Sequence, residues 1–304
     1  MSVVIVSWNV HDLLAQALSS LYRHAEHLDP LEVIVVDNAS QDGSAEMVAR
    51  EFPEVHLIAN RDNRGFTGGN NQGLTAASGD YVLLLNSDAE VRPGALQALV
   101  SYLDEHPDTG MVGPHLLNAD GSTQSSRRRF PTLPVLFLES TWLQGLLPRS
   151  ALARYYAQDL PDTREQDVDW ITGAAMLVRR EAVDQVGMFD EGYFMYSEEL
   201  DWCRRFREAG WRIAYTPRSE IIHYGGKSSE QVTAARHIYF QSSKVRYTRK
   251  VHGVLTAEVL RLWLLVQYLA QIVLEGTKWI VGHRRELRSA RVKAYLRVMR
   301  SRLR

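Results

Sequence analysis

The chain contains 304 residues, of which 45% are hydrophobic, 23% charged and 9% aromatic, and its formal net charge is -1. This composition excludes a disordered or fibrous protein. The single cysteine, Cys203, excludes a disulfide framework and a cysteine-only zinc site. The length fits one large domain with an appendage, or two domains.

The first part of the chain alternates apolar runs of strand length with helical patterns. It begins with VVIVSWN at 3–9, which lacks the basic region and cleavage site of a secretory signal and predicts a first strand. Further strands are predicted at 32–37, 55–60 and 81–88, and helices at 13–22, around 47–48, at 73–77 and at 93–106, with a Gly/Asn-rich loop at 60–73. Strands that are apolar on both faces and alternate with helices are typical of a doubly wound, mostly parallel sheet flanked by helices. We therefore expect an α/β fold.

The pattern is less regular after about residue 112. We expect a hairpin or an irregular segment around 118–121, a strand over 168–180 and a short helix that ends at Gly187. A strong helix over 197–210, with Ser197 as its N-cap and Gly210 as its stop, leads to a strand at 212–217. From residue 234 the chain is predicted to be helical almost to its end.

The C-terminal region combines an apolar helix with a basic tail. Segment 254–280 is rich in Leu, Val, Ile and Trp, and polar residues interrupt it at helical intervals: Glu258, Arg261, Gln267, Gln271 and Glu275. Residues 278–304 carry ten Lys or Arg side chains against one acid, Glu286. These features predict an amphipathic helix on an anionic inner membrane leaflet rather than an uninterrupted span. A helix packed on the core or in a homodimer interface is the alternative, and both remain open.

Three predicted strands end in polar groups. Asn9 follows the first, Asp37 closes the second, and Asn86, Ser87 and Asp88 close the strand at 81–88. Ligands of an open parallel sheet bind beyond the carboxyl ends of its strands, so these residues predict one site. Taken singly, each is also a normal turn former or helix cap.

Asp88 and the loop at 60–73 both suggest contacts with a diphosphate. Asp88 is a hard oxygen ligand that suits a divalent cation. In the loop at 60–73, glycines such as Gly65 allow backbone amides to approach a phosphate or sugar, and Arg64 adds positive charge. The loop matches neither GxGxxG nor the P-loop.

A pair of acids, Glu198 and Glu199, follows the aromatic segment GYFMY. Apolar surroundings and a like-charged neighbour raise a carboxyl pKa toward the range of a general base, although acids also favour a helix start without any function. His223 is credible only as a partner of Asp88 on one metal. The run Arg127–Arg129 is expected to be solvated charge, and Cys203 to pack on a helix face.

Seven segments in this order resemble the inverting family 2 glycosyltransferases with a GT-A fold, especially bacterial rhamnosyltransferase-like members. They are VVIVSWN, VIVVDNASQDGS, NRGFTGGNNQG, GDYVLLLNSDAEV, WITGAAMLVRR, FDEGYFMYSEELDWCRR and IIHYGGKSS. The resemblance implies a GT-A domain at 1–240, with a nucleotide-sugar half at 1–115 and an acceptor half at 116–240, followed by a C-terminal helical and basic extension at 241–304.

The resemblance also implies roles for single residues. Asp37 would accept a hydrogen bond from the pyrimidine N–H, with Ser7 and Asn9 holding the base. Asp88 and His223 would bind the metal, Mg²⁺ or Mn²⁺. Asn86 stands where the family usually has an acid that faces the ribose.

On the acceptor side, Glu199 would be the base, where the family usually has Asp, and Glu198 would support the acceptor. Trp170, Gly173 and Ala174 would line that side. Glu199 would remove a proton from the acceptor hydroxyl as its oxygen attacks the anomeric carbon from the face opposite the nucleotide, which inverts that centre.

The expected function is metal-dependent transfer of a sugar from a nucleotide diphosphate donor to a hydroxyl of a glycan or lipid-linked glycan, in cell-surface polysaccharide synthesis. The resemblance favours dTDP-rhamnose, with UDP-hexoses next. The expected location is cytoplasmic, peripheral on the inner face of the membrane, and no nucleic-acid partner is expected. A non-catalytic nucleotide-sugar binding protein and a nucleotidyltransferase are the alternatives; the absence of GxGxxG after the first strand disfavours a nicotinamide oxidoreductase.

Overall fold

A computed structural model of the chain describes residues 1–304 except 26, 27, 29, 226–232 and 283. The end of the predicted motif IIHYGGKSS, 226–229, lies outside the described residues. The chain divides into two compact units. The first comprises Met1–Phe130, Ala153–Phe194 and Glu198–Ser228, and the second comprises Pro131–Leu152, Met195–Ser197 and Ser229–Arg304.

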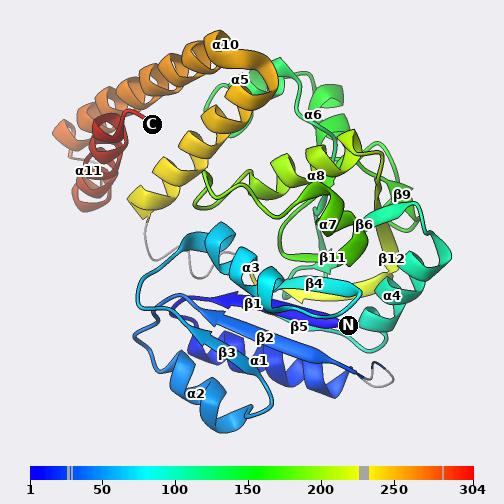
Figure 1. Ribbon diagram of the computed structural model, residues 1–304. Coiled ribbons are helices and arrows are strands. Elements are labelled where there is room, and N and C mark those ends of the chain that lie inside the picture. Colours follow the sequence, from blue (N-terminus) through cyan, green and yellow to red (C-terminus); the bar gives the residue numbers. More distant parts are fainter. Residues whose placement is uncertain (26–27, 29, 226–232, 283) are drawn as a thin grey trace. The chain divides into compact units, whose positions relative to one another are not determined.

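The first unit carries an α/β sheet and its covering helices (Figure 1). Its elements are β1 (Ser2–Ser7), α1 (His11–Arg23), β2 (Glu32–Asp37), α2 (Ser44–Glu51), β3 (His56–Ala59), α3 (Gly65–Ala76), β4 (Tyr81–Asn86), β5 (Ala89–Val91), α4 (Ala95–Glu105), β6 (Thr109–Leu117), β7 (Thr123–Gln124), β8 (Arg127–Arg128), β9 (Gln166–Asp167), β10 (Trp170–Ile171), β11 (Ala175–Arg179), α7 (Arg180–Val186), α8 (Glu198–Glu208) and β12 (Arg212–His223). The remaining elements are α5 (Leu133–Leu138), η1 (Gln144–Leu146), α6 (Arg149–Tyr155), α10 (Thr233–Ile280) and α11 (Arg285–Ser301).

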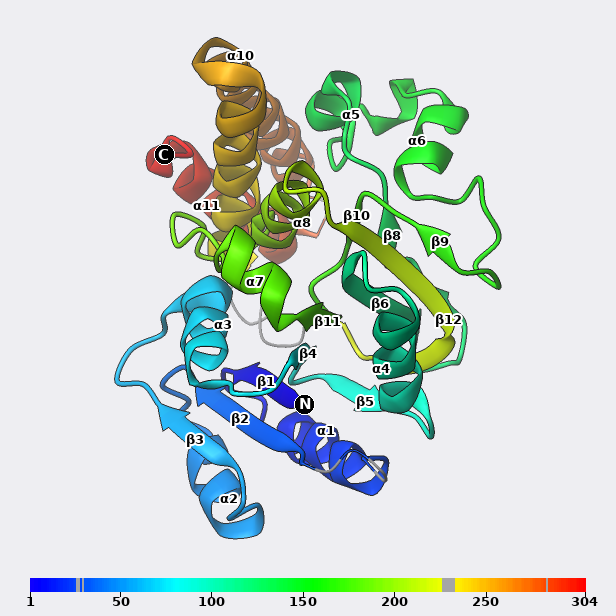
Figure 2. The same ribbon diagram turned by 45° about the vertical axis from the view of Figure 1, so that its right-hand side comes forward.

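The main sheet is mixed and mostly parallel, as predicted. Its strand order is β3-β2-β1-β4-β11-β6-β12-β5. Strands β1 to β4 are parallel, β11 runs antiparallel to both β4 and β6, and β12 runs parallel to β6. A separate antiparallel pair joins β8 to β10. Helix α4 contacts β6 and β12 (Figure 2).

Strand β1 is buried on both faces, which explains its continuous apolar sequence. Val3 and Ile5 belong to the core that includes Leu14 and Leu18 of α1. Val4, which alternates with them, faces α3 on the opposite side. Figure 1 shows α1 and α2 on one side of this part of the sheet and α3 on the other.

The prediction of a Gly/Asn-rich loop at 60–73 is wrong for most of this segment, because residues 65–76 form helix α3. The glycines let this helix approach the sheet closely. A Cβ at position 69 would lie 2.7 Å from Val6 Cγ1, and a Cβ at position 73 would overlap Val4. Glycine costs about 1 kcal/mol of helix propensity, and close packing against β1 compensates for that cost.

Two further expectations differ from the structure. The predicted strand at 168–180 is divided into two strands, β10 and β11, because segment 172–174 turns between two sheets. The arginines at 127–129 are not simply solvated. Arg127 is 8% exposed, donates to the carbonyls of Leu160 and Pro161, and lies over the Tyr215 ring.

The second unit is built mainly from α10 and α11. Helix α10 turns sharply at Gly253, whose φ of 84° and ψ of 167° are non-helical (Figure 1). The part after this turn packs against α11 through a cluster that includes Leu260, Leu264 and Val298. By length and composition alone, α10 from Ala234 to Ile280 is apolar enough to cross a membrane, although only 28% of its most apolar window is buried.

Candidate active site

The carboxyl ends of β2, β1 and β4 lie side by side at one edge of the sheet. Ser7 pairs with Asp37, and Val6 pairs with Asn86. The predicted convergence of these three strand ends is therefore confirmed, and it follows from their parallel order.

Asp37 is arranged to receive a hydrogen-bond donor from outside the protein. It is 3% exposed, and its Oδ2 accepts a 2.9 Å hydrogen bond from the Ser40 amide. Its Oδ1 is buried and has no partner among the described residues, and the same is true of Ser7 Oγ. Buried acceptors are normally satisfied, so these two oxygens point to a missing donor.

Asn9 shapes the loop above this edge. It adopts a left-handed φ of 52°, and its amide N–H donates to Ser40 Oγ at 2.9 Å. Its Oδ1 accepts from the Gln41 amide at 2.7 Å. The side chain thus ties the loop after β1 to the loop after β2 and presents backbone groups beside Asp37.

Asp88 and His223 come together from opposite ends of the sequence. Asp88 Oδ1 lies 3.2 Å from His223 Nε2, and both side chains are largely buried. The antiparallel pairing of β5 with β12 places them there, because Ala89 pairs with His223 and the Tyr224 amide donates to the Asp88 carbonyl at 2.9 Å. Asn86 Nδ2 lies 3.2 Å from the same His223 nitrogen, and Ser87 between them is 6% exposed.

Gln124 assigns the tautomer of His223. The Gln124 amide donates to Asn118 Oδ1 and to the His223 carbonyl, so its Oε1 must accept the proton of His223 Nδ1 at 2.6 Å. The lone pair of Nε2 then points toward Asp88. An imidazole held in this way by a polar neighbour is typical of a histidine that binds a metal.

The pair fits a divalent cation that also binds a substrate phosphate. No group of three or more His, Cys, Asp and Glu side chains that could hold a metal occurs among the described residues. Magnesium and manganese sites in enzymes commonly use one or two protein ligands and fill the remaining positions with substrate oxygens and water.

The segment from Trp170 to Ala174 connects this edge to the acid pair. The Asn86 amide donates to the Ala174 carbonyl at 2.9 Å. Gly173 faces Phe66 of α3, and a Cβ there would lie 3.4 Å from the Phe66 ring. Trp170 is 7% exposed and donates from Nε1 to the Arg129 carbonyl at 3.0 Å. At the other end of the segment, β10 contacts α8, whose first residues are the two acids.

Glu198 and Glu199 differ in their surroundings. Glu198 is 4% exposed, and burial together with the neighbouring Glu199 carboxylate raises its pKa well above the usual range. Glu199 is half-buried, and burial raises its pKa to about 6. Burial therefore favours the protonated form of Glu198, while Glu199 changes its charge near pH 6, which is the property required of a base.

The backbone before the acids is strained. Tyr196 and Ser197 have left-handed φ values of 70° and 61°. Such values cost about 1–2 kcal/mol per residue for side chains other than glycine, and they concentrate at functional sites. Ser197 therefore does not have the extended conformation typical of an N-cap, which the sequence had predicted.

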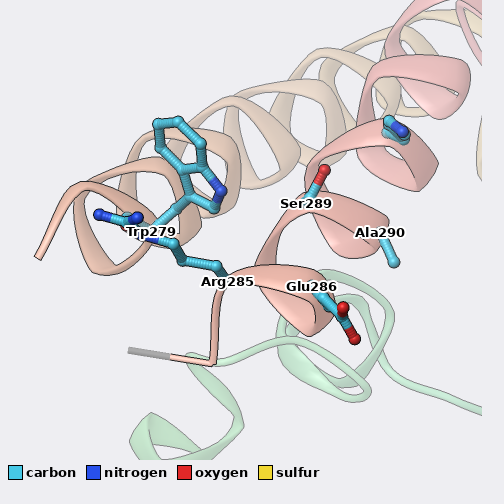
Figure 3. A pocket seen from close by; sticks show the side chains of 6 residues that line it. Trp279, Arg285, Glu286, Ser289 and Ala290 are labelled. Carbon is cyan, nitrogen blue, oxygen red and sulfur yellow. The ribbon is translucent and has the colours of Figure 1, made fainter. Parts of the chain in front are cut away.

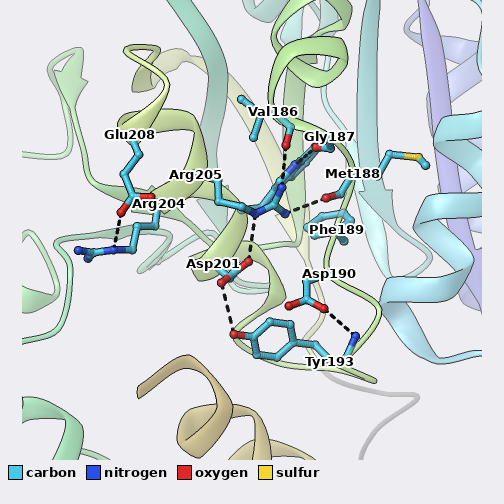
Figure 4. A network of polar contacts seen from close by, with 12 residues as sticks. Val186, Gly187, Met188, Phe189, Asp190, Tyr193, Asp201, Arg204, Arg205 and Glu208 are labelled. Atoms are coloured by element: carbon cyan, nitrogen blue, oxygen red, sulfur yellow. Dashed lines mark hydrogen bonds and ion pairs between the residues drawn. The ribbon is translucent and has the colours of Figure 1, made fainter. Parts of the chain in front are cut away.

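Two polar networks hold the loop that leads to the acids. Arg205 forms an ion pair with Asp201 at 3.2 Å and donates to the carbonyls of Val186 and Met188 (Figure 4). Asp201 therefore pairs with Arg205, whereas Arg204 pairs with Glu208. The second network joins Asn71 of α3 to both backbone groups of Phe189 at 3.0 Å.

The N-terminus of α3 has little free hydrogen-bonding capacity. The Gly65 amide donates to Asn63 Oδ1, and the Phe66 amide donates to the Phe194 carbonyl. Gly65 is needed because a Cβ there would overlap Phe194. Arg64 precedes the helix and is exposed. The Asn/Gly-rich sequence thus serves mainly to attach the 189–194 loop to α3, and the side chain of Arg64 is its charged group at the surface.

Two residues of the site were not foreseen in the sequence. Gln124 lies in a predicted irregular region, and only the β6–β7 hairpin brings it to His223. Arg128 pairs with Trp170 across β8 and β10, and its charge lowers the pKa of Glu199 in opposition to burial. Neither has a local motif that distinguishes it from a surface residue.

Comparisons with known proteins agree with this geometry. Residues 2–187 match the profile of glycosyl transferase family 2. The chain is 32% identical to the N-acetylglucosaminyl-diphospho-decaprenol L-rhamnosyltransferase of Mycobacterium tuberculosis (strain CDC 1551 / Oshkosh), over 75% of this chain and 76% of the relative. It is 26% identical to the rhamnosyltransferase WbbL of Escherichia coli (strain K12), over 81% of this chain and 91% of the relative.

A solved structure shows the same fold. The mannosyltransferase PcManGT from Pyrobaculum calidifontis, in complex with GDP-Man and Mn²⁺, aligns with a TM-score of 0.57 and 17% identity, over 99% of this chain and 86% of the other. The predicted α/β fold of the GT-A type, with a C-terminal helical extension, is confirmed.

Proposed function

Because the chain belongs to glycosyl transferase family 2 and is a glycosyltransferase, we propose that it is an inverting rhamnosyltransferase. Its donor would be dTDP-rhamnose and its acceptor a hydroxyl of a lipid-linked glycan, in the synthesis of a cell-surface polysaccharide. The observation that carries the proposal is the sheet edge at which Asp37 Oδ1 has no partner among the described residues while Asp88 and His223 lie 3.2 Å apart. The names of the two relatives support rhamnose, and the M. tuberculosis name supports a lipid-linked acceptor.

The donor would lie along this sheet edge. Asp37 Oδ1 would accept a hydrogen bond from the N–H of the thymine ring, beside Ser7 and the backbone near Asn9. Asn86 and Ser87 would face the ribose and diphosphate. Arg64 would add a charged contact to the donor from the start of α3. Gly65, whose amide already donates to Asn63 Oδ1, would hold the chain in place beside it.

Asp88 and His223 would hold Mg²⁺ or Mn²⁺, which supplies charge neutralisation for the departing diphosphate when it is bound. The relevant property of the chain is that Gln124 keeps the Nε2 lone pair of His223 directed toward Asp88. PcManGT was solved with Mn²⁺ and a nucleotide sugar, which is consistent with this assignment without deciding between the two metals.

Glu199 would act as the base. Its carboxylate takes the proton of the acceptor hydroxyl while that oxygen forms a bond to the anomeric carbon and the bond from this carbon to the diphosphate oxygen breaks. Attack from the opposite face inverts the anomeric centre in one step, and no covalent sugar intermediate forms. Glu198, whose protonated form is favoured by burial, would support the acceptor, and Trp170, Gly173 and Ala174 would line that side.

In this proposal residues 1–115 bind mainly the donor, and residues 116–240 contribute mainly to the acceptor side. Residues 241–304 form a helical extension. The cytoplasmic location and the homodimer considered from the sequence stay predictions.

The proposal is tested with the purified full chain and a synthetic polyprenyl diphosphate N-acetylglucosamine. The protein is incubated with this acceptor, with one donor (dTDP-rhamnose, UDP-glucose, UDP-galactose or GDP-mannose) and with Mg²⁺ or Mn²⁺. We expect a product heavier by one deoxyhexose from dTDP-rhamnose alone, with an inverted anomeric centre by NMR, and loss of the reaction in EDTA.

Transfer from a UDP-hexose alone would overturn the rhamnose donor, and full activity in EDTA would overturn the metal. Release of pyrophosphate from a nucleoside triphosphate would instead support a nucleotidyltransferase.

A further inference from the structure

The three residues before the acid pair belong to a different unit from the acids themselves. Segment Met195–Ser197 groups with the second unit, and a peptide bond joins it to Glu198, the first residue of α8 in the first unit. Tyr196 and Ser197 both have left-handed φ values. Such residues keep this conformation only where the surrounding structure holds them in it. The contacts of this segment therefore influence how Glu199, the second residue of α8, is presented.

Helix α10 supplies two of these contacts, and both lie within the second unit. Ser243 Oγ donates a 2.8 Å hydrogen bond to the Met195 carbonyl, and the Ser243 side chain is buried. The Phe240 ring meets the Tyr196 ring in an edge-to-face arrangement, with 5.5 Å between the ring centres. Positions 240 and 243 are three residues apart and therefore share one face of the helix.

The hydrogen bond from Ser243 takes the place of a local one. A serine or threonine hydroxyl inside a helix commonly donates to the carbonyl one turn earlier. Thr248 of the same helix does so, since its Oγ1 donates to the Lys244 carbonyl at 2.8 Å. Ser243 instead donates to a carbonyl 48 residues away in the sequence. Its hydroxyl thus serves the segment before the acids rather than its own helix.

The turn of α10 that carries these residues is itself held in place. Lys244 Nζ donates to the Glu139 carbonyl at 3.0 Å and lies 3.6 Å from the Glu139 carboxylate, and both side chains are buried. The same ammonium lies 5.5 Å from the centre of the Phe240 ring. A buried ion pair resists displacement, because separation would leave an unpaired charge inside the protein. Phe240 and Ser243 therefore form a firm support for the segment.

The chain on either side of segment 195–197 is fixed by other contacts. Before it, the Phe194 carbonyl accepts a 3.0 Å hydrogen bond from the Phe66 amide. After it, Asp201 of α8 pairs with Arg205 at 3.2 Å (Figure 4). The left-handed turn lies between these two anchors, so a loss of its support would displace the start of α8.

We propose that Ser243 and Phe240 are positioning residues of the transfer reaction. They hold the left-handed turn at Tyr196 and Ser197, and this turn directs the carboxylate of Glu199 toward the acceptor hydroxyl. The inference rests on the proposed function, since it takes Glu199 as the base. It gives helix α10, which follows the sheet in the sequence, a part in the reaction.

The test compares two variants with the unmodified full chain. Ser243→Ala removes the donor to the Met195 carbonyl, and Phe240→Leu removes the aromatic contact while keeping an apolar side chain. We expect each to lower kcat by about 10–100-fold, because a small displacement of a base is costly. The affinity for dTDP in calorimetry should stay the same. Ser243→Thr keeps the hydroxyl and should retain kcat, and an equal loss there would overturn the role of Ser243.

The titration of Glu199 gives a second readout that does not require turnover. Carboxyl ¹³C NMR of the glutamate-labelled chain follows it, with Glu199→Gln to assign the signal. Burial raises the pKa of Glu199 to about 6. A loosened turn would admit water, so in both variants this pKa should fall toward the ordinary carboxyl value. Glu198 and Arg128, whose charges act on the acid pair, are the same in every variant.

Ser289→Ala is the matched control, because it makes the same chemical change elsewhere in the second unit. Ser289 of α11 lines a hollow of about 420 Å³, together with Trp279 at the end of α10 and Arg285 (Figure 3). Loss of this hydroxyl should leave kcat, the affinity for dTDP and the pKa of Glu199 unchanged.

The proposal is overturned if Ser243→Ala and Phe240→Leu keep the kcat and the Glu199 pKa of the unmodified chain, whatever their Tm. It is also overturned if kcat falls while this pKa stays the same, or if the affinity for dTDP falls as much as kcat, because either result indicates a general structural defect. If the unmodified chain transfers no sugar, the proposed function fails, whereas the NMR titration still shows whether α10 positions Glu199.

Discussion

Glu198 and Glu199 show how two identical side chains acquire different chemistry from position alone. The helix turns Glu198 into the protein and leaves Glu199 half-buried. Burial penalises the charged form of both, and the nearby Arg128 offsets part of that penalty at Glu199. The sequence indicates an acid pair, whereas the division of roles between them depends on which one faces the interior.

Replacement of Glu199 by Gln tests the role of the base. We expect Glu199→Gln to lower kcat by about 10²–10⁴-fold while the affinity for the donor nucleotide stays nearly the same, because the amide cannot take a proton. Initial rates and calorimetric titration of dTDP measure the two effects. Asp184→Asn, an exposed acid on α7, is a control that should leave both unchanged. Unaltered turnover in Glu199→Gln would remove this residue from the role.

The pKa of Glu199 sets the pH dependence of the reaction. Burial raises this pKa to about 6. The base must be deprotonated, so kcat/KM should fall about tenfold per pH unit below pH ~6 and level off above it. A pH–rate profile between pH 5 and 8 checks this, and an acid limb centred near the ordinary carboxyl value would disagree with it.

Gln124 acts on the metal through His223. Gln124→Ala removes the acceptor for Nδ1–H, which frees the ring to rotate and to change tautomer, so the affinity for Mn²⁺ should fall by about 10–100-fold. Gln124→Glu keeps an acceptor and should retain most of the affinity. Titration of Mn²⁺ followed by electron paramagnetic resonance measures this without turnover. Equal affinity in the alanine variant would reduce Gln124 to a structural role.

At the scale of elements, α3 shows how a helix can have the composition of a loop. Its glycines and asparagines predicted an irregular segment, but Gly69 and Gly73 face β1 at a distance that excludes a side chain. Asn71 then holds the loop at 189–194, because its side-chain Nδ2 donates to the Phe189 carbonyl and its Oδ1 accepts from the Phe189 amide. Tertiary packing therefore overrides the intrinsic propensity of these residues.

This packing predicts opposite effects for two glycines of the same helix. Gly73→Ala forces a methyl group into Val4 and should destabilise the chain by about 1–3 kcal/mol. At Gly68 the nearest atom is Arg64 Cβ, at 3.1 Å, which belongs to an exposed side chain. Gly68→Ala should be neutral or stabilising by up to about 1 kcal/mol. Urea denaturation measures both, and equal destabilisation would contradict the close-packing explanation.

At the scale of the whole molecule, charge is distributed unevenly along the chain. Residues 278–304 hold ten of the 35 Lys and Arg side chains, and most of them are exposed in and around α11. The proposed active site instead gathers acids, with Asp37, Asp88, Glu198 and Glu199 all in the first unit. Net charge alone, at -1, conceals this separation.

The sequence by itself determined the class of fold, the order of the β1–β4 region and the edge at which the polar strand ends meet. These features follow from local patterns, because apolar runs, helical periodicity and parallel connections repeat within short stretches. It also indicated the acid pair and the apolar, basic C-terminal region.

Only the tertiary structure decided the rest. Several decisive contacts join residues that are far apart in the sequence. They are the contacts of Asp88 with His223, of His223 with Gln124 and of Gly73 with Val4. The surroundings that raise the pKa of Glu199, and the exposure of apolar side chains on α10 such as Leu255 and Val266, likewise depend on what the fold places beside them. Burial and proximity are properties of the folded chain, and no local pattern encodes them.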